Sequence, residues 1–222
     1  MTAGLPFGLR RGVTLVIDDG PSDATPLLLD QLERHGHRAV LFLIGGNVSG
    51  REEIVVDALR RGFALGNHSF SHPYFSAISL DEARAEIEAT EALIEAAHAR
   101  ARVRRRAKWF RFPYLDTGEA QFQVLQALLK AFGFQCPRTV RRRQFAEDMA
   151  RIDWQTTVNT RDWASPEEAE LRQAVSQARP GDVIEFHDKI ETVGPYVGPL
   201  LEELAAKSLR ATIPGQWIGA PW

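Results

Sequence analysis

The stretch VTLVIDDGPS, Val13 to Ser22, joins an apolar run to two adjacent acids and a Gly-Pro turn. Successive side chains of a strand point to opposite faces, so one of the two acids, Asp18 or Asp19, should enter apolar surroundings. A buried carboxylate costs several kcal/mol unless it is paired or bound to a metal. The alternative is a helix cap or a turn, because aspartate is common before Gly-Pro. The rest of the chain distinguishes the two interpretations.

The composition predicts one folded domain over residues 1–222, because a chain of this length can form a single large core. Hydrophobic residues make up 44% of the chain and charged residues 25%, which excludes a disordered protein. The net charge of −2 argues against a nucleic-acid-binding protein. Cys136 is the only cysteine, so an intrachain disulfide and a cysteine-pair zinc site are both excluded.

The N-terminal stretch MTAGLPFGLRRG (1–12) lacks the apolar core of a signal peptide, and no apolar run reaches the length of a membrane span. We therefore expect no membrane span and no export signal. That pattern predicts a cytoplasmic protein by default, and an extracytoplasmic one if a leader has been trimmed from the chain.

Strand-like runs alternate with helical patterns along the chain. The strand-like runs are 13–17, 39–44, 63–67, 108–112, 156–159, 182–186 and 209–213. The helical patterns are 24–35, 51–61, 79–98, 119–132, a helix opening at about 165, and 196–207. Strand followed by helix, repeated along the chain, predicts an α/β protein with a parallel sheet, open or closed into a barrel.

Three of these helices carry start signals. Ser22 and Asp23 are candidate caps for the helix over 24–35. Ser79 and Glu82 have the spacing of a capping box. Ser165 precedes a proline at the first helical position, so we expect it to cap the helix that follows.

Two arginine-rich runs, ARARVRRRAK (99–108) and RTVRRR (138–143), could contact a polyanion, but such runs are more often solvated loops. A nucleic-acid-binding protein would need both runs on one surface. The near-neutral net charge argues against that function.

Polar clusters follow two of the strand-like runs. His68 and His72 are one helical turn apart, a common spacing of metal ligands, and Pro73 keeps them in a single turn or loop. The alternative is two surface histidines. Arg111 ends an apolar run, so it either points into a site and pairs with a carboxylate or lies exposed at a strand end.

Two weaker clusters, Asp162-Trp163 and His187-Asp188, follow later strand-like runs. Each alone is more typical of a turn or of the core. Together with the earlier clusters, however, they share one position in the predicted fold. Each cluster lies where a strand ends and a loop begins. In a parallel α/β barrel those points meet at one end, which is where active sites lie.

In this order the clusters resemble the motifs of the polysaccharide deacetylase family, the NodB homology domain of carbohydrate esterase family 4. The matching motifs span residues 13 to 188 and are Asp18-Asp19-Gly20-Pro21, His68-x-x-x-His72, Arg111-x-Pro113-Tyr114, Asp162-Trp163 and His187-Asp188. The first three are highly specific together, and the last two are weaker. The resemblance implies a distorted (β/α)7-8 barrel that hydrolytically removes the N-acetyl group from an amino sugar in an oligo- or polysaccharide.

The resemblance also implies which residues bind a metal and which transfer protons. Asp19, His68 and His72 would hold a divalent metal, usually zinc, with Co²⁺, Ni²⁺ or Fe²⁺ as alternatives. Such a site keeps a position open for water. Asp18 would be the general base that takes a proton from this water, and His187 would protonate the leaving amine.

Further residues would support these groups. By the same resemblance Arg111 would orient the base, and Asp162 would keep the acid protonated. The backbone N–H of Tyr114, which follows Pro113, would stabilise the oxyanion. Trp163 would form a wall of the pocket for the acetyl methyl group.

Two positions depart from the family pattern. Asn159 stands where an aspartate is frequent, and we expect little consequence. Glu185 stands where a leucine usually lines the acyl pocket. It either turns away to pair with an arginine or reshapes the pocket for a different or more polar acyl group.

The expected partners are therefore an N-acetylated amino-sugar glycan, such as peptidoglycan or chitin, or a small N-acyl sugar. For the small substrate the protein would be a deformylase or amidase. Two further possibilities are a xylan O-acetyl esterase and a non-catalytic glycan-binding domain.

Overall fold

The computed structural model of the protein describes residues 12–136 and 152–214. The arginine-rich run at 138–143 and nearly all of the N-terminal stretch 1–12 lie outside these residues. Across the two described ranges, no helix combines the length and the apolar character that crossing a bilayer requires.

The strands form one parallel sheet, as the alternation predicts. They are β1 (Gly12–Gly20), β2 (Ala39–Leu43), β3 (Ala64–Asn67), β4 (Val158–Asn159), β5 (Val183–His187) and β6 (Arg210–Ala211). Their order is β3-β2-β1-β5-β4, and β6 pairs with the start of β1. Both β1 and β5 are buried along their whole length, which is typical of parallel strands covered on both faces.

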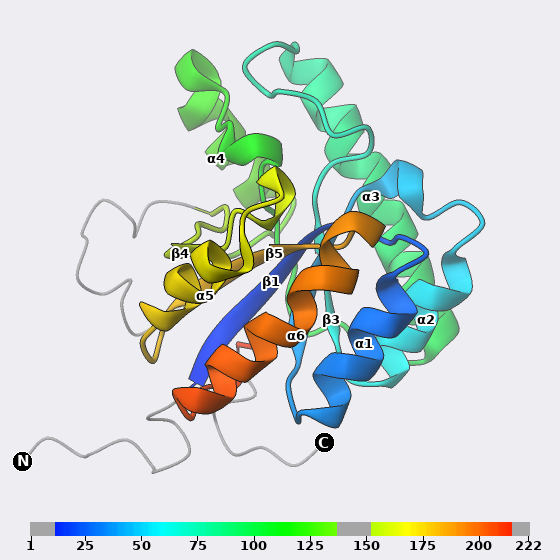
Figure 1. The fold of residues 1–222 in the computed structure, drawn as a ribbon. Coiled ribbons are helices and arrows are strands. Elements are labelled where there is room, and N and C mark those ends of the chain that lie inside the picture. The colour runs from blue at the N-terminus through cyan, green and yellow to red at the C-terminus, as the bar shows by residue number, and fades with distance from the viewer. Residues whose placement is uncertain (1–11, 137–151, 215–222) are drawn as a thin grey trace, which may run out of the picture.

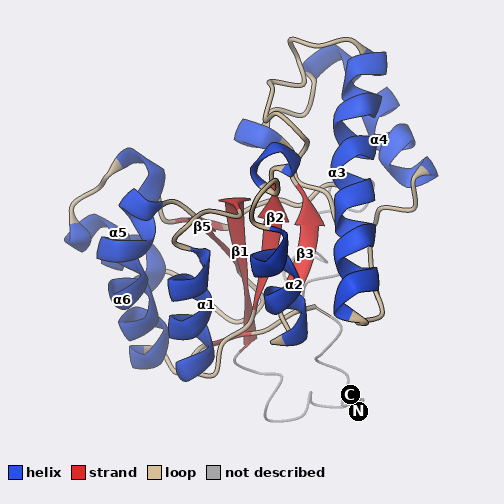
Figure 2. Cartoon of the chain, turned by 90° about the vertical axis from the view of Figure 1, so that its right-hand side faces the viewer, coloured by secondary structure: helices blue, strands red, loops and turns tan. Residues whose placement is uncertain are grey.

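Helices cover the outside of this sheet. They are α1 (Thr25–Arg34), α2 (Glu52–Arg60), α3 (Leu80–Ala101), α4 (Phe122–Ala131), α5 (Glu168–Ser176) and α6 (Ile190–Ala206). Figure 1 shows α1, α2 and α6 along one side of the strands, with α4 above them. In Figure 2 the arrowheads of β1, β2 and β3 point the same way, and α3 and α4 extend beyond them.

The segment 108–112, which we expect as a strand, forms single bridges instead. Phe110 bridges Asn67 of β3, and its carbonyl accepts the N–H of Trp154 at 3.0 Å. Because Trp154 lies shortly before β4, backbone hydrogen bonds continue round from β3 toward β4. The sheet is therefore curved into a distorted barrel rather than flat.

The capping box at Ser79 is confirmed, since Ser79 accepts the N–H of Glu82 and Glu82 accepts the N–H of Ser79. Two other predicted caps are wrong. The N-cap of α1 is Ala24, without a side-chain bond, so neither Ser22 nor Asp23 caps that helix. The N-cap of α5 is Glu167, in a capping box with Glu170.

Helix α6 begins at Ile190 rather than at residue 196, and it contains Pro195 and Pro199. Its buried side chains recur at helical spacing from Thr192 to Leu204. Burial of this face therefore outweighs the backbone hydrogen bonds that the two prolines cannot donate.

The arginine-rich run at 99–108 is anchored to α3 rather than presented as a basic patch. Arg105 contacts Glu91 and Glu95, and its side chain is only 9% exposed. Lys108 contacts the same two glutamates. These contacts neutralise part of the run and argue against a polyanion site there.

His37 is a buried histidine whose Nδ1 accepts the N–H of Ala211 at 3.0 Å, which ties the loop before β2 to β6. Burial, together with the charges of His35 and Arg210, lowers the pKa of His37 to about 4. The unfolded chain therefore binds this proton first as the pH falls from about 6.5 to about 4, and stability is lost across that window.

We expect this histidine to lower the free energy of unfolding by about 3 kcal/mol between pH 7 and pH 4. Urea denaturation of the wild type and His37→Gln at several pH values across the window measures it. Carboxylates titrate in both proteins, so the difference between their slopes isolates His37. Equal slopes would contradict the prediction.

Candidate active site

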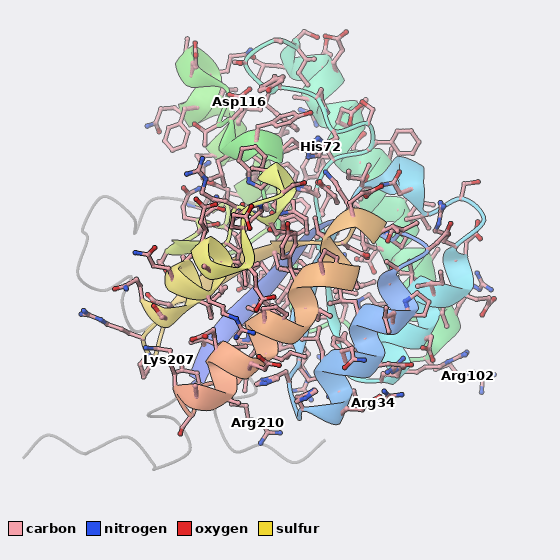
Figure 3. All side chains as sticks on the ribbon, in the orientation of Figure 1. Arg34, His72, Arg102, Asp116, Lys207 and Arg210 are labelled. Atoms are coloured by element: carbon pink, nitrogen blue, oxygen red, sulfur yellow. The ribbon has the colours of Figure 1, made fainter. Side chains whose placement is uncertain are left out.

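The predicted site residues converge at the carboxyl end of the sheet. A cavity of about 760 Å³ lies there. Its lining includes Asp18, Asp19, His68, His72, Arg111, Tyr114, Trp163, Glu185 and His187. Asp162 and Pro113 are buried behind it. Figure 3 shows His72 at this end of the molecule and Arg34, Lys207 and Arg210 at the other.

Asp18 and Asp19 both face this cavity because the alternation of side chains along β1 is broken at Asp19. Its φ of 71° lies in the left-handed region, which interrupts the alternation of side chains. The pairing of β1 with β2 also shifts its register between Ile17 and Gly20. This break explains how neighbouring acids serve one site.

Asp19 lies beside both predicted histidine ligands. Its Oδ1 is 3.1 Å from Nε2 of His72 and 3.6 Å from Nε2 of His68. Nδ1 of His68 donates to the carbonyl of Arg111 at 2.8 Å. The lone pair of Nε2 is therefore free to bind a metal. The chain reaches this geometry through a loop, not a helix, since Ser69 and His72 have positive φ.

These side chains fit a divalent metal. One carboxylate oxygen and two imidazole nitrogens lie within 4.8 Å of one another and face the cavity. Such a set is typical of catalytic zinc sites, which keep one position open.

Asp19 is held in its charged form, as a metal ligand must be. Burial alone would raise its pKa, but hydrogen bonds from His68 and His72 outweigh burial and hold the pKa well below its usual range. Lys189 contacts the other oxygen, with Nζ 2.7 Å from Oδ2. Lys189 was not predicted as a site residue from the sequence, although it directly follows the His187-Asp188 motif.

Arg111 is fully buried between two carboxylates. Its Nε donates to Oδ2 of Asp18 at 2.6 Å, and its Nη2 forms an ion pair with Oε2 of Glu185. Burial disfavours the charge of Arg111, but the charges of Asp18 and Glu185 outweigh burial and raise its pKa. Glu185 thus pairs with an arginine, one of the two alternatives, and still lines the cavity.

Each of these carboxylates uses only one oxygen for Arg111. Oδ1 of Asp18 is buried and has no hydrogen-bond partner among the described residues. Oε2 of Glu185 also accepts from Thr156 at 2.5 Å, a residue that the sequence analysis did not single out. The free oxygen of Asp18 is therefore available to accept a proton from the cavity.

His187 is oriented by Asp162. Its Nδ1 lies 3.0 Å from Oδ1 of Asp162, and the backbone N–H of His187 donates to Oδ2 of Asp162 at 2.9 Å. Burial lowers the pKa of His187, but the hydrogen bond and charge of Asp162, with the charges of Asp18 and Asp19, raise it to about 9. Such an imidazole is protonated at neutral pH, as a general acid requires.

Asp188, the residue after His187, also lines the cavity. It accepts hydroxyl hydrogen bonds from Ser22 at 2.7 Å and Thr25 at 2.5 Å. Burial raises the pKa of Asp188, and these hydrogen bonds oppose the rise. The contacts tie the end of β5 to the start of α1.

Aromatic rings form the rim of the cavity. Tyr114 stacks on Tyr74 with ring centroids 4.0 Å apart and meets His72 edge-on at 4.5 Å. Trp163 is 54% exposed and also lines the cavity. Tyr74 is absent from the sequence-predicted site, although it follows the His72-Pro73 pair. Asn159 lines the cavity, and its side chain accepts the N–H of Arg161.

The chain is similar to known deacetylases. A family model described as polysaccharide deacetylase matches residues 9–135. A peptidoglycan-N-acetylglucosamine deacetylase of Bacillus cereus is 39% identical over 83 residues, which is 37% of this chain and 30% of that protein. A chitooligosaccharide deacetylase of Bradyrhizobium sp. is 30% identical over 180 residues, 80% of this chain and 71% of that protein.

The coverage of some curated relatives is small. The matches span 30%, 25% and 19% of the length of three of them. A solved family 4 carbohydrate esterase from Streptomyces lividans, in complex with acetate, is 26% identical, with a TM-score of 0.72 over 91% of this chain and 92% of that one. This similarity confirms the predicted distorted (β/α)7-8 barrel. Because the family model covers more than half of the chain, the protein belongs to the polysaccharide deacetylase family.

Proposed function

We propose that the protein is a metal-dependent hydrolase that removes the N-acetyl group from an amino sugar in an oligo- or polysaccharide. One catalytic domain over residues 1–222 would carry this activity. The observation that supports it best is the contrast between two adjacent acids. Asp19 lies beside two imidazoles, whereas Asp18 is held by Arg111 and keeps a free buried oxygen.

Asp19, His68 and His72 would hold the metal, zinc by preference, with Co²⁺, Ni²⁺ or Fe²⁺ as alternatives. The metal supplies Lewis acidity when bound, which polarises the substrate carbonyl and lowers the pKa of the attacking water. The chain itself provides the proton transfers.

Asp18 takes the proton of the attacking water on Oδ1, because Oδ2 is already held by Arg111. His187 then gives a proton to the leaving amine. Asp162 holds the ring so that Nε2 faces the cavity, and it favours the charged imidazole. The two proton carriers approach the substrate from neighbouring strands, since Asp18 and His187 are register partners in β1 and β5.

The remaining groups bind and orient the substrate. The backbone N–H of Tyr114 donates to the oxyanion, and Pro113 begins the short turn in which Tyr114 takes a left-handed φ of 55°. Trp163 and the ring of Tyr114 provide apolar walls at the rim. Glu185 lines the cavity, where it would face the acyl group.

Amine release from a substrate panel tests this function. The panel contains chitooligosaccharides, peptidoglycan fragments, acetylated xylan, and N-formyl and N-acetyl sugar nucleotides, each with and without a chelator. We expect chelator-sensitive release from the N-acetylated glycans. The absence of both bound metal and turnover on any substrate would overturn the hydrolase, and sugar binding without metal-dependent turnover would leave a glycan-binding protein.

Glu185 favours a second candidate substrate, a small N-acyl sugar handled by the same chemistry. A carboxylate beside the acyl group suits a polar acyl group better than a methyl group, because an apolar group there gains no hydrogen bond. Preferential release from the N-formyl or N-acetyl sugar nucleotides would select this deformylase or amidase function.

Replacing one metal ligand should remove the metal. We expect His72→Ala to weaken zinc affinity by more than about 100-fold, since loss of an outer partner alone costs roughly 10- to 100-fold. Metal analysis after equilibrium dialysis measures it. His98→Ala is the matched control, because His98 lies on α3 and contacts the carbonyl of Val103, away from the cavity. Equal zinc content in both variants would contradict the assignment.

A further inference from the structure

A second set of metal-binding side chains lies beside the first. One oxygen of Asp18, one oxygen of Glu185 and one ring nitrogen of His187 lie within 4.8 Å of one another. Asp18 and His187 are register partners on adjacent strands. Glu185 shares a face of β5 with His187, because side chains two residues apart point the same way. Two carboxylates and an imidazole suit a divalent cation.

The free oxygens of this set point to a ligand that the protein atoms do not supply. Asp18 is only 3% exposed, and its Oδ1 is buried without a hydrogen-bond partner among the described residues. Oε2 of Glu185 is held by Arg111 and Thr156, whereas Oε1 lies 3.9 Å from Nε2 of His187. A buried acceptor without a partner requires an explanation, and a bound cation provides one.

The histidine is already oriented for such binding. Nδ1 of His187 is engaged by Asp162, which in turn accepts the hydroxyl of Thr160 at 2.6 Å. A carboxylate behind the ring is the arrangement that orients metal-binding histidines. It leaves Nε2 facing Asp18 and Glu185.

The charges of the set leave room for one more cation. Asp18, Glu185 and Asp162, which pairs with His187, carry three negative charges, and Arg111 carries one positive charge. The two remaining negative charges match the charge of one divalent ion, whereas a proton on Nε2 of His187 balances only one of them. A leucine at position 185 would remove one of the three ligands.

We propose that Asp18, Glu185 and His187 form a second divalent-cation site, and that zinc bound there inhibits the hydrolase. The ion would occupy the free oxygen of the base and displace the proton from Nε2 of the acid, so neither could serve the reaction. The inhibition rests on the proposed function, whereas the binding does not.

Zinc titration of the metal-free protein, by equilibrium dialysis with metal analysis, tests the site. We expect two zinc ions per chain in the wild type, the second bound at least about 10-fold more weakly, and one in Glu185→Leu. The first ion should bind Glu185→Leu within about 3-fold of wild-type affinity, which also shows that the variant is folded. Glu191→Gln, which changes another acid lining the cavity, is the matched control and should keep two ions. One ion in the wild type up to millimolar zinc, or two in Glu185→Leu, would overturn the site.

Activity separates this proposal from the proposed function. Excess zinc should inhibit amine release by the wild type at least about 10-fold more strongly than release by Glu185→Leu. If no substrate is turned over, the hydrolase fails while the count of bound ions still tests the site. If turnover occurs and only one ion binds, the second site alone fails.

Discussion

Replacing Asp18 by asparagine should lower kcat by roughly 10³-fold while folding and the metal at Asp19, His68 and His72 are preserved. The side-chain oxygen of asparagine can still accept from Arg111, which leaves an amide that cannot take a proton at the position of Oδ1. Arg111 also keeps Glu185 as a partner, so no charge is left alone in the core. The loss should therefore appear in catalysis and not in stability.

Steady-state amine release, zinc analysis and urea denaturation of the same preparations measure the three quantities. Asp23→Asn is the matched control, because Asp23 lines the same cavity but its side chain is 69% exposed and pairs with Arg51. A kcat within about 10-fold of the wild type for Asp18→Asn would show that Asp18 is not the general base.

Removing Arg111 should be the most destabilising single change at the site. In Arg111→Leu, Asp18 and Glu185 would remain buried without their cation, and breaking a buried pair in this way costs about 3–5 kcal/mol. Urea denaturation of the metal-free protein at pH 7 measures the free energy of unfolding. Arg100→Leu is the control, because its exposed pair with Glu53 should be worth no more than about 1 kcal/mol.

A double variant tests the cause. Arg111→Leu with Glu185→Leu removes one of the two stranded carboxylates, so it should recover part of the lost stability. A cost below about 1 kcal/mol for Arg111→Leu, or no recovery in the double variant, would show that the buried charges are balanced in another way.

The sequence alone predicts where the polar clusters meet, but not how each side chain is aimed. The apolar runs before Asp18, His68 and His187 predict parallel strands, and the carboxyl ends of such strands share one edge. The left-handed φ of Asp19, in contrast, leaves no trace in the hydrophobic pattern, so the way two neighbouring acids reach one cavity needed the structure. Whether Glu185 pairs with an arginine or reshapes the acyl pocket also depended on the position of Arg111, which lies far away in the chain.

The failed cap at Ser165 shows why a local signature can mislead. Asp162 is fixed by the backbone N–H of His187, which lies 25 residues further along the chain, a contact that no local pattern contains. The short helix over 162–164 is held there, between left-handed residues at Arg161 and Ser165. Tertiary contacts therefore displaced the start of α5. Lys189 and Thr156 were missed for the same reason, because their partners lie on distant segments.

The position of β1 has a consequence for how the protein is made. Synthesis proceeds from the N-terminus, so the ribosome releases β1 with Asp18 and Asp19 first, and soon afterwards β2, its partner on one side. Its partners on the other side, β5 and β6, emerge only after α1 to α5. Until then the nascent chain carries a buried-type strand with an open edge, the kind of surface that attracts unwanted pairing. The last residue of β5, His187, completes the site, so a chain stopped before it would hold the metal ligands and the base but lack the acid.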